Sequence, residues 1–255
     1  MYVYWLEQRE QDVPPGNGWL SAEEELRLNA LRFAKRRADW RLGRWTAKCA
    51  LAGTTDAAHA SDALNHYHSN TLRKIEICAA SSGAPEALID GQPLGMTISL
   101  SHRDGRAVCA VAASQADLGC DLEIIEPRSD AFVADYFTVE EQTLVLRASD
   151  ADRARLCTLL WSAKESALKA LRTGLRSDTR AVMVSAAPAP AGGDDWSPLR
   201  IRYSAGNRIF HGWWRQSHNL LRTVVADPAP DPPISLTTHV TKLGGFVNGI
   251  RLEAL

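Results

Sequence analysis

Alternating apolar and polar positions near the middle of the chain predict a sheet. Residues 96–100 and 106–112 are β-like runs, and the Asp104-Gly105 pair between them favours a tight hairpin turn. A third run, residues 118–125, follows after a short break. The pattern therefore predicts a hairpin and one further strand at the centre of the sequence.

Helical signals lie on both sides of these strands. Ser21 and Glu24 have the spacing of a capping box, which opens a predicted helical region through about residue 51, with a gap near residues 37–40. The helices predicted beyond the strands are around residues 130–136, from Thr138, and over residues 152–171, where Gly174 ends the helix.

The remaining segments complete a mixed α/β pattern. The other predicted strands are residues 1–6, 74–79, 183–185, 199–204, 209–216 and 220–226. Residues 53–70, 188–195 and 227–233 read as loops, and the last twenty residues carry no clear pattern. Because strand, long helix and sheet recur in that order, we predict two halves, residues 1–115 and 116–255.

The composition of the chain argues against several classes of protein. A net charge of −1 gives no general attraction to nucleic acid or anionic membranes, so anions must be bound by local clusters. No run of 18 apolar residues and no leader pattern occur, so we expect a cytoplasmic protein without a membrane span. The five cysteines are odd in number and far apart, which favours free thiols over a disulfide framework.

Two acidic residues on the predicted central strand suggest a cation site. Asp121 and Glu123 are two positions apart, so both side chains project from one face of the strand. Two adjacent carboxylates repel unless a cation lies between them, and Mg²⁺ commonly takes one or two carboxylates together with phosphates. The competing interpretation is a solvated strand face.

The long predicted helix adds a third carboxylate. Glu165 lies on the same helical stripe as Trp161 and Leu168, and Lys169 follows one turn later. A carboxylate between two apolar residues on a core-facing stripe is unusual. A surface Glu-Lys pair, with Trp161 as simple core, is the alternative.

Two further groups could bind an anion. Ser101 and His102 come just before the predicted hairpin turn, and as neighbours on a strand they point to opposite faces, which suits phosphate binding better than a catalytic dyad. Residues 32–48 carry seven cations opposed only by Asp39. On a helix, four of them form one positive stripe: Arg37, Arg41, Arg44 and Lys48. A capped turn and a solvated helix face are the alternatives.

Three of these motifs, in this order, resemble those of the surfactin-type 4′-phosphopantetheinyl transferases. They are a Ser-His pair, a G-x-D-x-E strand at residues 119–123 and a W-S-x-K-E-x-x-x-K helix at residues 161–169. The resemblance runs from about residue 32 to residue 171. It implies a pseudo-dimer of two similar α/β halves, each with a small, mostly antiparallel sheet and a long helix, and with coenzyme A in the cleft between them.

The resemblance also implies roles for single residues. Asp121, Glu123 and Glu165 would hold Mg²⁺, or Mn²⁺, against the pyrophosphate of coenzyme A. The implied contacts to coenzyme A are Ser101, His102, Lys164 and Lys169, to which the charge pattern adds Arg37, Arg41, Arg44 and Lys48 for the 3′-phosphate. Where many members have Gly-Lys-Pro, this chain has Gly83-Ala84-Pro85, so that lysine contact is missing.

The implied reaction moves phosphopantetheine to a protein. A serine hydroxyl of an apo acyl or peptidyl carrier protein would attack the β-phosphate of coenzyme A, and adenosine 3′,5′-bisphosphate would leave. The implied catalytic residues are Glu165 as the base, directly or through a water molecule, Lys169 at the phosphates, and Glu141 as a rival base. Carriers of fatty-acid, polyketide, siderophore and non-ribosomal peptide systems all stay open, and two halves in one chain favour a monomer.

Two other functions fit the same residues. A Mg²⁺-dependent phosphohydrolase or nuclease also uses clustered carboxylates, although two-metal enzymes usually have more than three. A coenzyme A-binding protein without chemistry would leave the carboxylates incidental. Transfer of mass to a carrier protein separates the three hypotheses.

Overall fold

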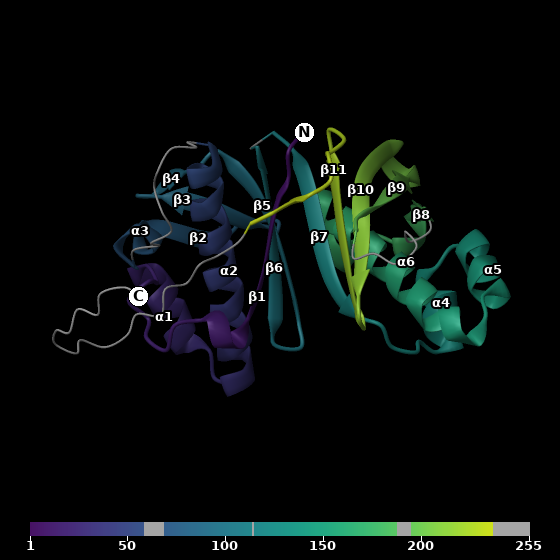
Figure 1. The fold of residues 1–255 in the computed structure, drawn as a ribbon, viewed down its shortest axis with the longest axis horizontal. Helices are drawn as coiled ribbons and strands as arrows, with labels where there is room; N and C mark the ends of the chain where they lie inside the picture. Colours follow the sequence, from purple (N-terminus) through teal and green to yellow (C-terminus); the bar gives the residue numbers. More distant parts are fainter. Residues whose placement is uncertain (59–68, 114, 188–194, 237–255) are drawn as a thin grey trace, which may run out of the picture.

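Two sheets pack against each other, and a long helix covers the outer face of each (Figure 1). The computed structural model describes residues 1–58, 69–113, 115–187 and 195–236. Nearly all of the last twenty residues, which showed no clear pattern in the sequence, lie outside the described residues. So do most of the predicted loops at residues 53–70 and 188–195. The predicted α/β class is confirmed.

The elements of the first half begin with a strand and two helices. In chain order they are β1 (Tyr4–Arg9), α1 (Ala22–Ala30), α2 (Ala34–Ala58), α3 (Ser69–Lys74), β2 (Ile75–Ala79), β3 (Pro85–Ile89), β4 (Gln92–Pro93), β5 (Met96–Arg103) and β6 (Arg106–Ala113). The hairpin predicted at Asp104-Gly105 is confirmed, with both residues at positive φ.

The elements of the second half again run as one strand, then helices, then further strands. Its elements are β7 (Asp117–Ile124), α4 (Asp130–Tyr136), α5 (Val139–Arg147), α6 (Asp150–Ala170), β8 (Val182–Ala186), β9 (Ser197–Tyr203), β10 (Arg208–Ser217), β11 (Leu220–Asp227) and β12 (Ile234–Ser235). The sheets have the orders β12-β1-β6-β5, β7-β11-β10-β9-β8 and β2-β3-β4. The strands β3, β4 and β12 had no clear pattern in the sequence.

The strand pairing of the first half recurs in the second. In each half the first strand pairs antiparallel with the last large strand, β1 with β6 and β7 with β11. That last strand then pairs with the one before it, β5 or β10. The recurrence supports the predicted pseudo-dimer, and the boundary near residue 115, between β6 and β7, stays a prediction.

Apolar side chains join the two halves across the inner faces of the sheets. Trp5 and Val108 from the first sheet pack in one core with Leu122 and Val224 from the second. Two further cores lie beneath α2 and α6, on the outer faces of the sheets. The molecule is therefore layered as helix, sheet, sheet, helix, which Figure 1 shows from its side.

The end of the described chain returns to the first sheet. After β11 it crosses to β1, where Ile234 donates its backbone N–H to the carbonyl of Val3 at 2.9 Å and β12 pairs in parallel with β1. An ion pair adds to this connection, because Arg222 of β11 donates to Glu7 of β1 at 2.6 Å. The second half is thus tied to the first by backbone and charge as well as by apolar packing.

Gly119 lets α6 lie directly on β7. A Cβ atom at this position would be 1.8 Å from the carbonyl oxygen of Ser166 and 2.8 Å from the backbone nitrogen of Ala170. No side chain fits into that space, because both neighbouring atoms belong to a helix backbone. This close approach sets the distance between the strand that carries Asp121 and the helix that carries Glu165 and Lys169.

We expect Gly119→Ala to move α6 away from β7. Overpacking of this kind costs about 1–3 kcal/mol of folding free energy, and here the backbone has to move. Urea unfolding measures the loss. Gly43→Ala in α2 is the matched control, because a Cβ there meets no atom within 4 Å, and it should stabilise the helix by about 0.5–1 kcal/mol. Equal stability of the two variants would contradict this account of the close contact.

Two predicted helix boundaries were wrong. The break expected near residues 37–40 lies at residues 31–33, because Arg37 donates to the carbonyl oxygens of Leu28 and Leu31 and caps the end of α1. The helical region expected to reach about residue 51 continues as α2 through Ala58. The helix predicted over residues 152–171 is confirmed as α6, with Leu171 as its C-cap, and Arg172 takes the left-handed conformation with φ of 57°. The misplaced break comes from a capping contact that the apolar pattern does not show.

Candidate active site

Alternate residues of β5 face β7 where the two sheets meet. Ser101 donates its hydroxyl to Oδ1 of Asp121 at 2.8 Å, and the hydroxyl of Ser99 accepts the backbone N–H of Cys120 at 2.9 Å. Arg103, two residues further along this face, approaches Glu123 with 3.8 Å between Nε and Oε2. The structure therefore brings the predicted serine to the predicted strand carboxylates.

Side chains of α6 reach the same carboxylates from the other side. Lys169 donates to Oδ1 of Asp121 at 2.7 Å and to the carbonyl oxygen of Cys120 at 3.0 Å. Trp161 donates its indole N–H to Oε1 of Glu123 at 3.2 Å. The helix motif and the strand motif, about forty residues apart in sequence, thus form one cluster.

The carboxylates of this cluster repel one another. Burial raises the pKa of Glu123, and the charge of Asp121 raises it further. The same two causes raise the pKa of Glu165, where Lys169 opposes them. Burial lowers the pKa of Lys169, but the charges of Asp121, Cys120 and Glu165 and the hydrogen bond to Asp121 together outweigh it, so the net shift is upward. The cluster therefore favours additional positive charge.

Two carboxylate oxygens at this place suit a divalent cation. Oδ2 of Asp121 and Oε2 of Glu123 are buried without a hydrogen-bond partner among the described residues, although Oε2 has Arg103 and Arg128 within ion-pair distance. No set of three or more His, Cys, Asp or Glu side chains in the described ranges is arranged to hold a metal ion by itself. A Mg²⁺ ion that uses one or two carboxylates and completes its shell with water and phosphate oxygens still fits these donors.

A cleft of about 740 Å³ opens beside Lys169, between the two halves. One wall comes from β3, β4 and β5, including Gly83-Ala84-Pro85, and the other from the end of α6 and residues 172–176. Its charged lining residues are Glu86, Lys169, Arg172 and Arg176. Cations therefore outnumber acids in this cleft, which suits a ligand with several phosphates.

Basic side chains of the predicted stripe on α2 contact other groups of the first half. Arg41 donates to the carbonyl oxygens of Pro14 and Gly16, and Arg44 lies 4.8 Å over the ring of Trp40. Lys48 is fully buried and pairs with Glu24 at 2.5 Å. These arginines are partly exposed, but the ammonium group of Lys48 has no path to a phosphate in this structure.

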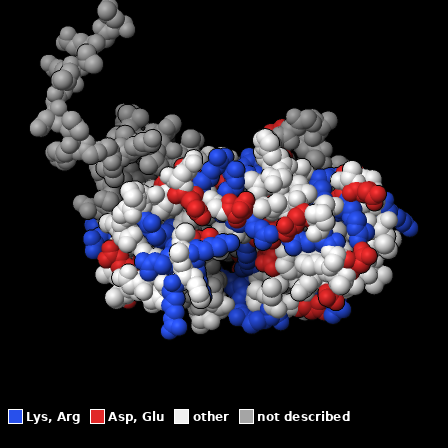
Figure 2. Space-filling model, turned by 90° about the horizontal axis from the view of Figure 1, so that it is seen from below, with Lys and Arg blue, Asp and Glu red and all other residues white. Residues whose placement is uncertain are grey.

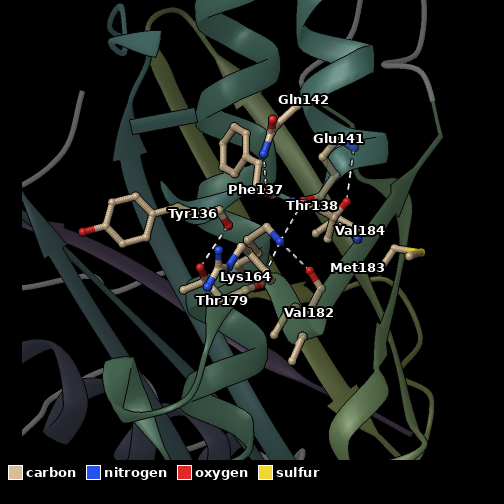
Figure 3. Close-up of polar contacts among 12 residues, drawn as sticks. Tyr136, Phe137, Thr138, Glu141, Gln142, Lys164, Thr179, Val182, Met183 and Val184 are labelled. Carbon is tan, nitrogen blue, oxygen red and sulfur yellow. Dashed lines mark hydrogen bonds and ion pairs between the residues drawn. The ribbon is translucent and has the colours of Figure 1, made fainter. Parts of the chain in front are cut away.

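Glu141 and Lys164 form a second buried pair, separate from the carboxylate cluster (Figure 3). Their charged atoms are 2.8 Å apart, and the side chains are 1% and 0% exposed. Lys164 also donates to the carbonyl oxygens of Thr179 and Val182, and Glu141 accepts the backbone N–H of Val184 at 3.0 Å. All of these bonds would have to break before either group could touch a substrate.

The same arrangement exists in the first half. In both halves a glutamate closes a capping box, with Ser21 for Glu24 and with Thr138 for Glu141. Each glutamate then pairs with a buried lysine of the following long helix and accepts a strand N–H, that of Ile77 in the first half. Each lysine donates to two backbone carbonyl oxygens, those of Trp19 and Leu72 for Lys48. The repetition identifies both pairs as parts of the framework.

His102 lies on the opposite face of β5 from Ser101 and is exposed. It is thus separated from Asp121 by the strand itself, as neighbouring residues on a strand point to opposite faces.

The face of the molecule seen from below carries acidic and basic side chains interspersed (Figure 2). None of the described helices combines the length and apolarity needed to span a bilayer.

Several residues at the site had not been singled out from the sequence. Ser99 and Arg103 could have been found from their spacing, since they alternate with Ser101 on one strand face. Arg128, 3.5 Å from Glu123, follows the end of β7 and carries no such signal. Arg172 has helical spacing from Glu165 and Leu168, but α6 ends before it and the residue lines the cleft.

The chain is similar to one known family over part of its length. A model described as the 4′-phosphopantetheinyl transferase superfamily matches residues 117–204. The matched segment begins with β7 and includes all of α6, so it contains Asp121, Glu123, Glu165 and Lys169. No curated protein sequence matches the chain. The match indicates phosphopantetheine transfer as the general class of activity.

Proposed function

We propose that this chain is a 4′-phosphopantetheinyl transferase that moves the phosphopantetheine group of coenzyme A to a serine of an apo acyl or peptidyl carrier protein. The observation that carries the proposal is the cluster in which Lys169 and Ser101 both hold Asp121, beside Glu123 and Glu165. It lies within the segment that matches the superfamily, and Lys169 also lines the cleft between the halves.

The residues of the cluster suit the charges of this reaction. The serine oxygen of the carrier forms a bond to the β-phosphorus, the bond from that phosphorus to the bridging oxygen breaks, and adenosine 3′,5′-bisphosphate leaves with the electron pair. Lys169 lies where it can face the negative charge that builds on the leaving phosphate. Asp121 holds this lysine in place, because it accepts its hydrogen bond at 2.7 Å.

A metal ion completes the proposed site. Asp121, Glu123 and Glu165 would hold Mg²⁺ or Mn²⁺, which when bound would neutralise the pyrophosphate and polarise its oxygens. Glu165 is our candidate for the group that accepts the serine proton, directly or through a water molecule, because its carboxylate lies in the same cluster as Asp121 and Lys169. Glu141 is a poor candidate, since its carboxylate is buried against Lys164.

Other residues are assigned by their positions. We propose Ser101 as a positioning residue for Asp121. Arg37, Arg41 and Arg44 stay candidates for the 3′-phosphate because each of these residues is partly exposed. Lys48 and Lys164 are fully buried and paired with carboxylates, so we propose that they support the fold.

Mass spectrometry of a carrier protein tests the proposal. The protein is incubated with coenzyme A, Mg²⁺ and several apo carrier proteins, and a carrier that gains the mass of one phosphopantetheine group supports transfer. Release of coenzyme A fragments without a carrier adduct would favour a phosphohydrolase instead. Binding of coenzyme A with neither product would favour a protein without chemistry.

A further inference from the structure

Arg172 has a backbone conformation that suits its residue type poorly. Five described residues other than glycine have a positive φ: Asp90, Asp104, Asn207, His218 and Arg172. Asp, Asn and His are the types that tolerate this region best, whereas an arginine there has the steric cost of its Cβ without a local compensation. Arg172 is therefore the exception in this set.

The position is one that a glycine would normally fill. Arg172 donates its N–H to the carbonyl of Lys169 at 2.9 Å, and Thr173 donates to the carbonyl of Leu168 at 3.1 Å. These two bonds are those of a Schellman motif, whose left-handed residue is most often glycine. A side chain kept at such a place, where a residue without one would be more stable, indicates a role for that side chain.

Arg172 borders the cleft, across from the turn at residues 83–85. Arg172 lines the cleft on the wall formed by the end of α6, and Gly83-Ala84-Pro85 lines the other wall. Arg176 spans the two walls, since it donates to the carbonyl oxygens of Ser82 and Arg172 at 3.1 and 3.2 Å. The backbone of Arg172 is thus held at the cleft both through its N–H and through its carbonyl oxygen.

An unpartnered group next to Arg172 also points to a ligand. The hydroxyl oxygen of Thr173 is buried without a hydrogen-bond partner in the described part of the chain, and Thr173 lines the same cleft. Buried hydroxyl groups nearly always have a partner, so a missing one suggests an acceptor or donor on a bound molecule. Lys169 and Arg172 place two cations along this wall of the cleft, with Thr173 beside them.

We propose that Arg172 binds a phosphate group of coenzyme A at the cleft wall formed by the end of α6. The inference rests on the proposed function for the identity of the ligand. The guanidinium group would meet the pyrophosphate or the 3′-phosphate, since both have the same chemistry. With arginine at this position the end of α6 is less stable than it would be with glycine, and the phosphate contact explains why an arginine stands there.

The substitution Arg172→Gly separates stability from binding. It should raise Tm by about 2–4 °C, because it relieves the left-handed strain. It should also raise the KM and the Kd for coenzyme A about tenfold, with kcat nearly unchanged, because a charge-assisted hydrogen bond is lost. Arg172→Lys should recover much of the affinity and none of the stability. Arg180→Ala is the matched control, as Arg180 is an exposed arginine outside the cleft that pairs with Asp178.

Calorimetric titrations with coenzyme A and with dephospho-coenzyme A identify the phosphate. If Arg172→Gly weakens both ligands equally, the contact is to the pyrophosphate; if it weakens only coenzyme A, the contact is to the 3′-phosphate. Unchanged affinity for both ligands in Arg172→Gly, while the unaltered protein transfers normally, would overturn the inference alone. Arginine-dependent binding in a protein that modifies no carrier would support the inference and count against the proposed function.

Discussion

Asp121→Ala should abolish transfer of phosphopantetheine while leaving the protein folded. Asp121 holds Lys169 and Ser101, and it supplies one of the two orphan oxygens that suit a divalent cation. Loss of a metal contact and of an oriented lysine should lower kcat/KM about a thousandfold. Transfer assays with an apo carrier protein, together with circular dichroism and Tm, measure the two parts of this expectation.

Two comparisons sharpen that test. Glu165→Gln keeps the size of the side chain and removes one of three repelling carboxylates, so it should also lose transfer at little cost to Tm. Asp117→Ala removes a carboxylate from the same strand, at the end where it pairs with Arg208, and should leave transfer close to normal. Near-normal transfer by Asp121→Ala or by Glu165→Gln would rule out the proposed metal ligands.

Lys164→Met should cause the largest loss of stability. The methionine fills most of the space but leaves the carboxylate of Glu141 buried without its cation, which costs about 3–5 kcal/mol. Adding Glu141→Gln should recover a good part of this loss, because the buried charge is then gone while the amide can still accept the N–H of Val184. Guanidinium unfolding of the single and double variants measures the difference.

The matching pair of the first half is the control for this prediction. Lys48→Met leaves Glu24 in the same situation, so a similar loss is expected. If Lys164 instead served coenzyme A, Lys164→Met would raise the KM while the free energy of unfolding changed by less than about 1 kcal/mol. That result would support Lys164 as a contact to coenzyme A.

The sequence predicted the carboxylate cluster well because its members lie at regular positions. The spacing of Asp121 and Glu123 on a strand, and of Trp161, Glu165 and Lys169 on a helix, needs only the periods of these elements. The strand pattern also predicted the central hairpin, because alternation and the Asp-Gly turn agree.

A stripe of basic residues does not predict which of its lysines is buried. A basic stripe on a helix looks the same in sequence whether it faces solvent or a buried carboxylate. The partner of Lys48 is 24 positions away, in the capping box of another helix, and no local pattern joins them. The left-handed conformation of Arg172 likewise has no local sequence signal, because it depends on how α6 ends.

The parallel pairing of β12 with β1 has a consequence for how this protein is made. During synthesis, β1, β5 and β6 all leave the ribosome more than a hundred residues before Ile234 and Ser235. Until then, β1 has an uncovered backbone edge, of the kind through which incomplete chains pair with one another. We therefore expect a truncation before residue 234 to favour aggregation of newly made chains, even where the purified protein shows little loss of stability.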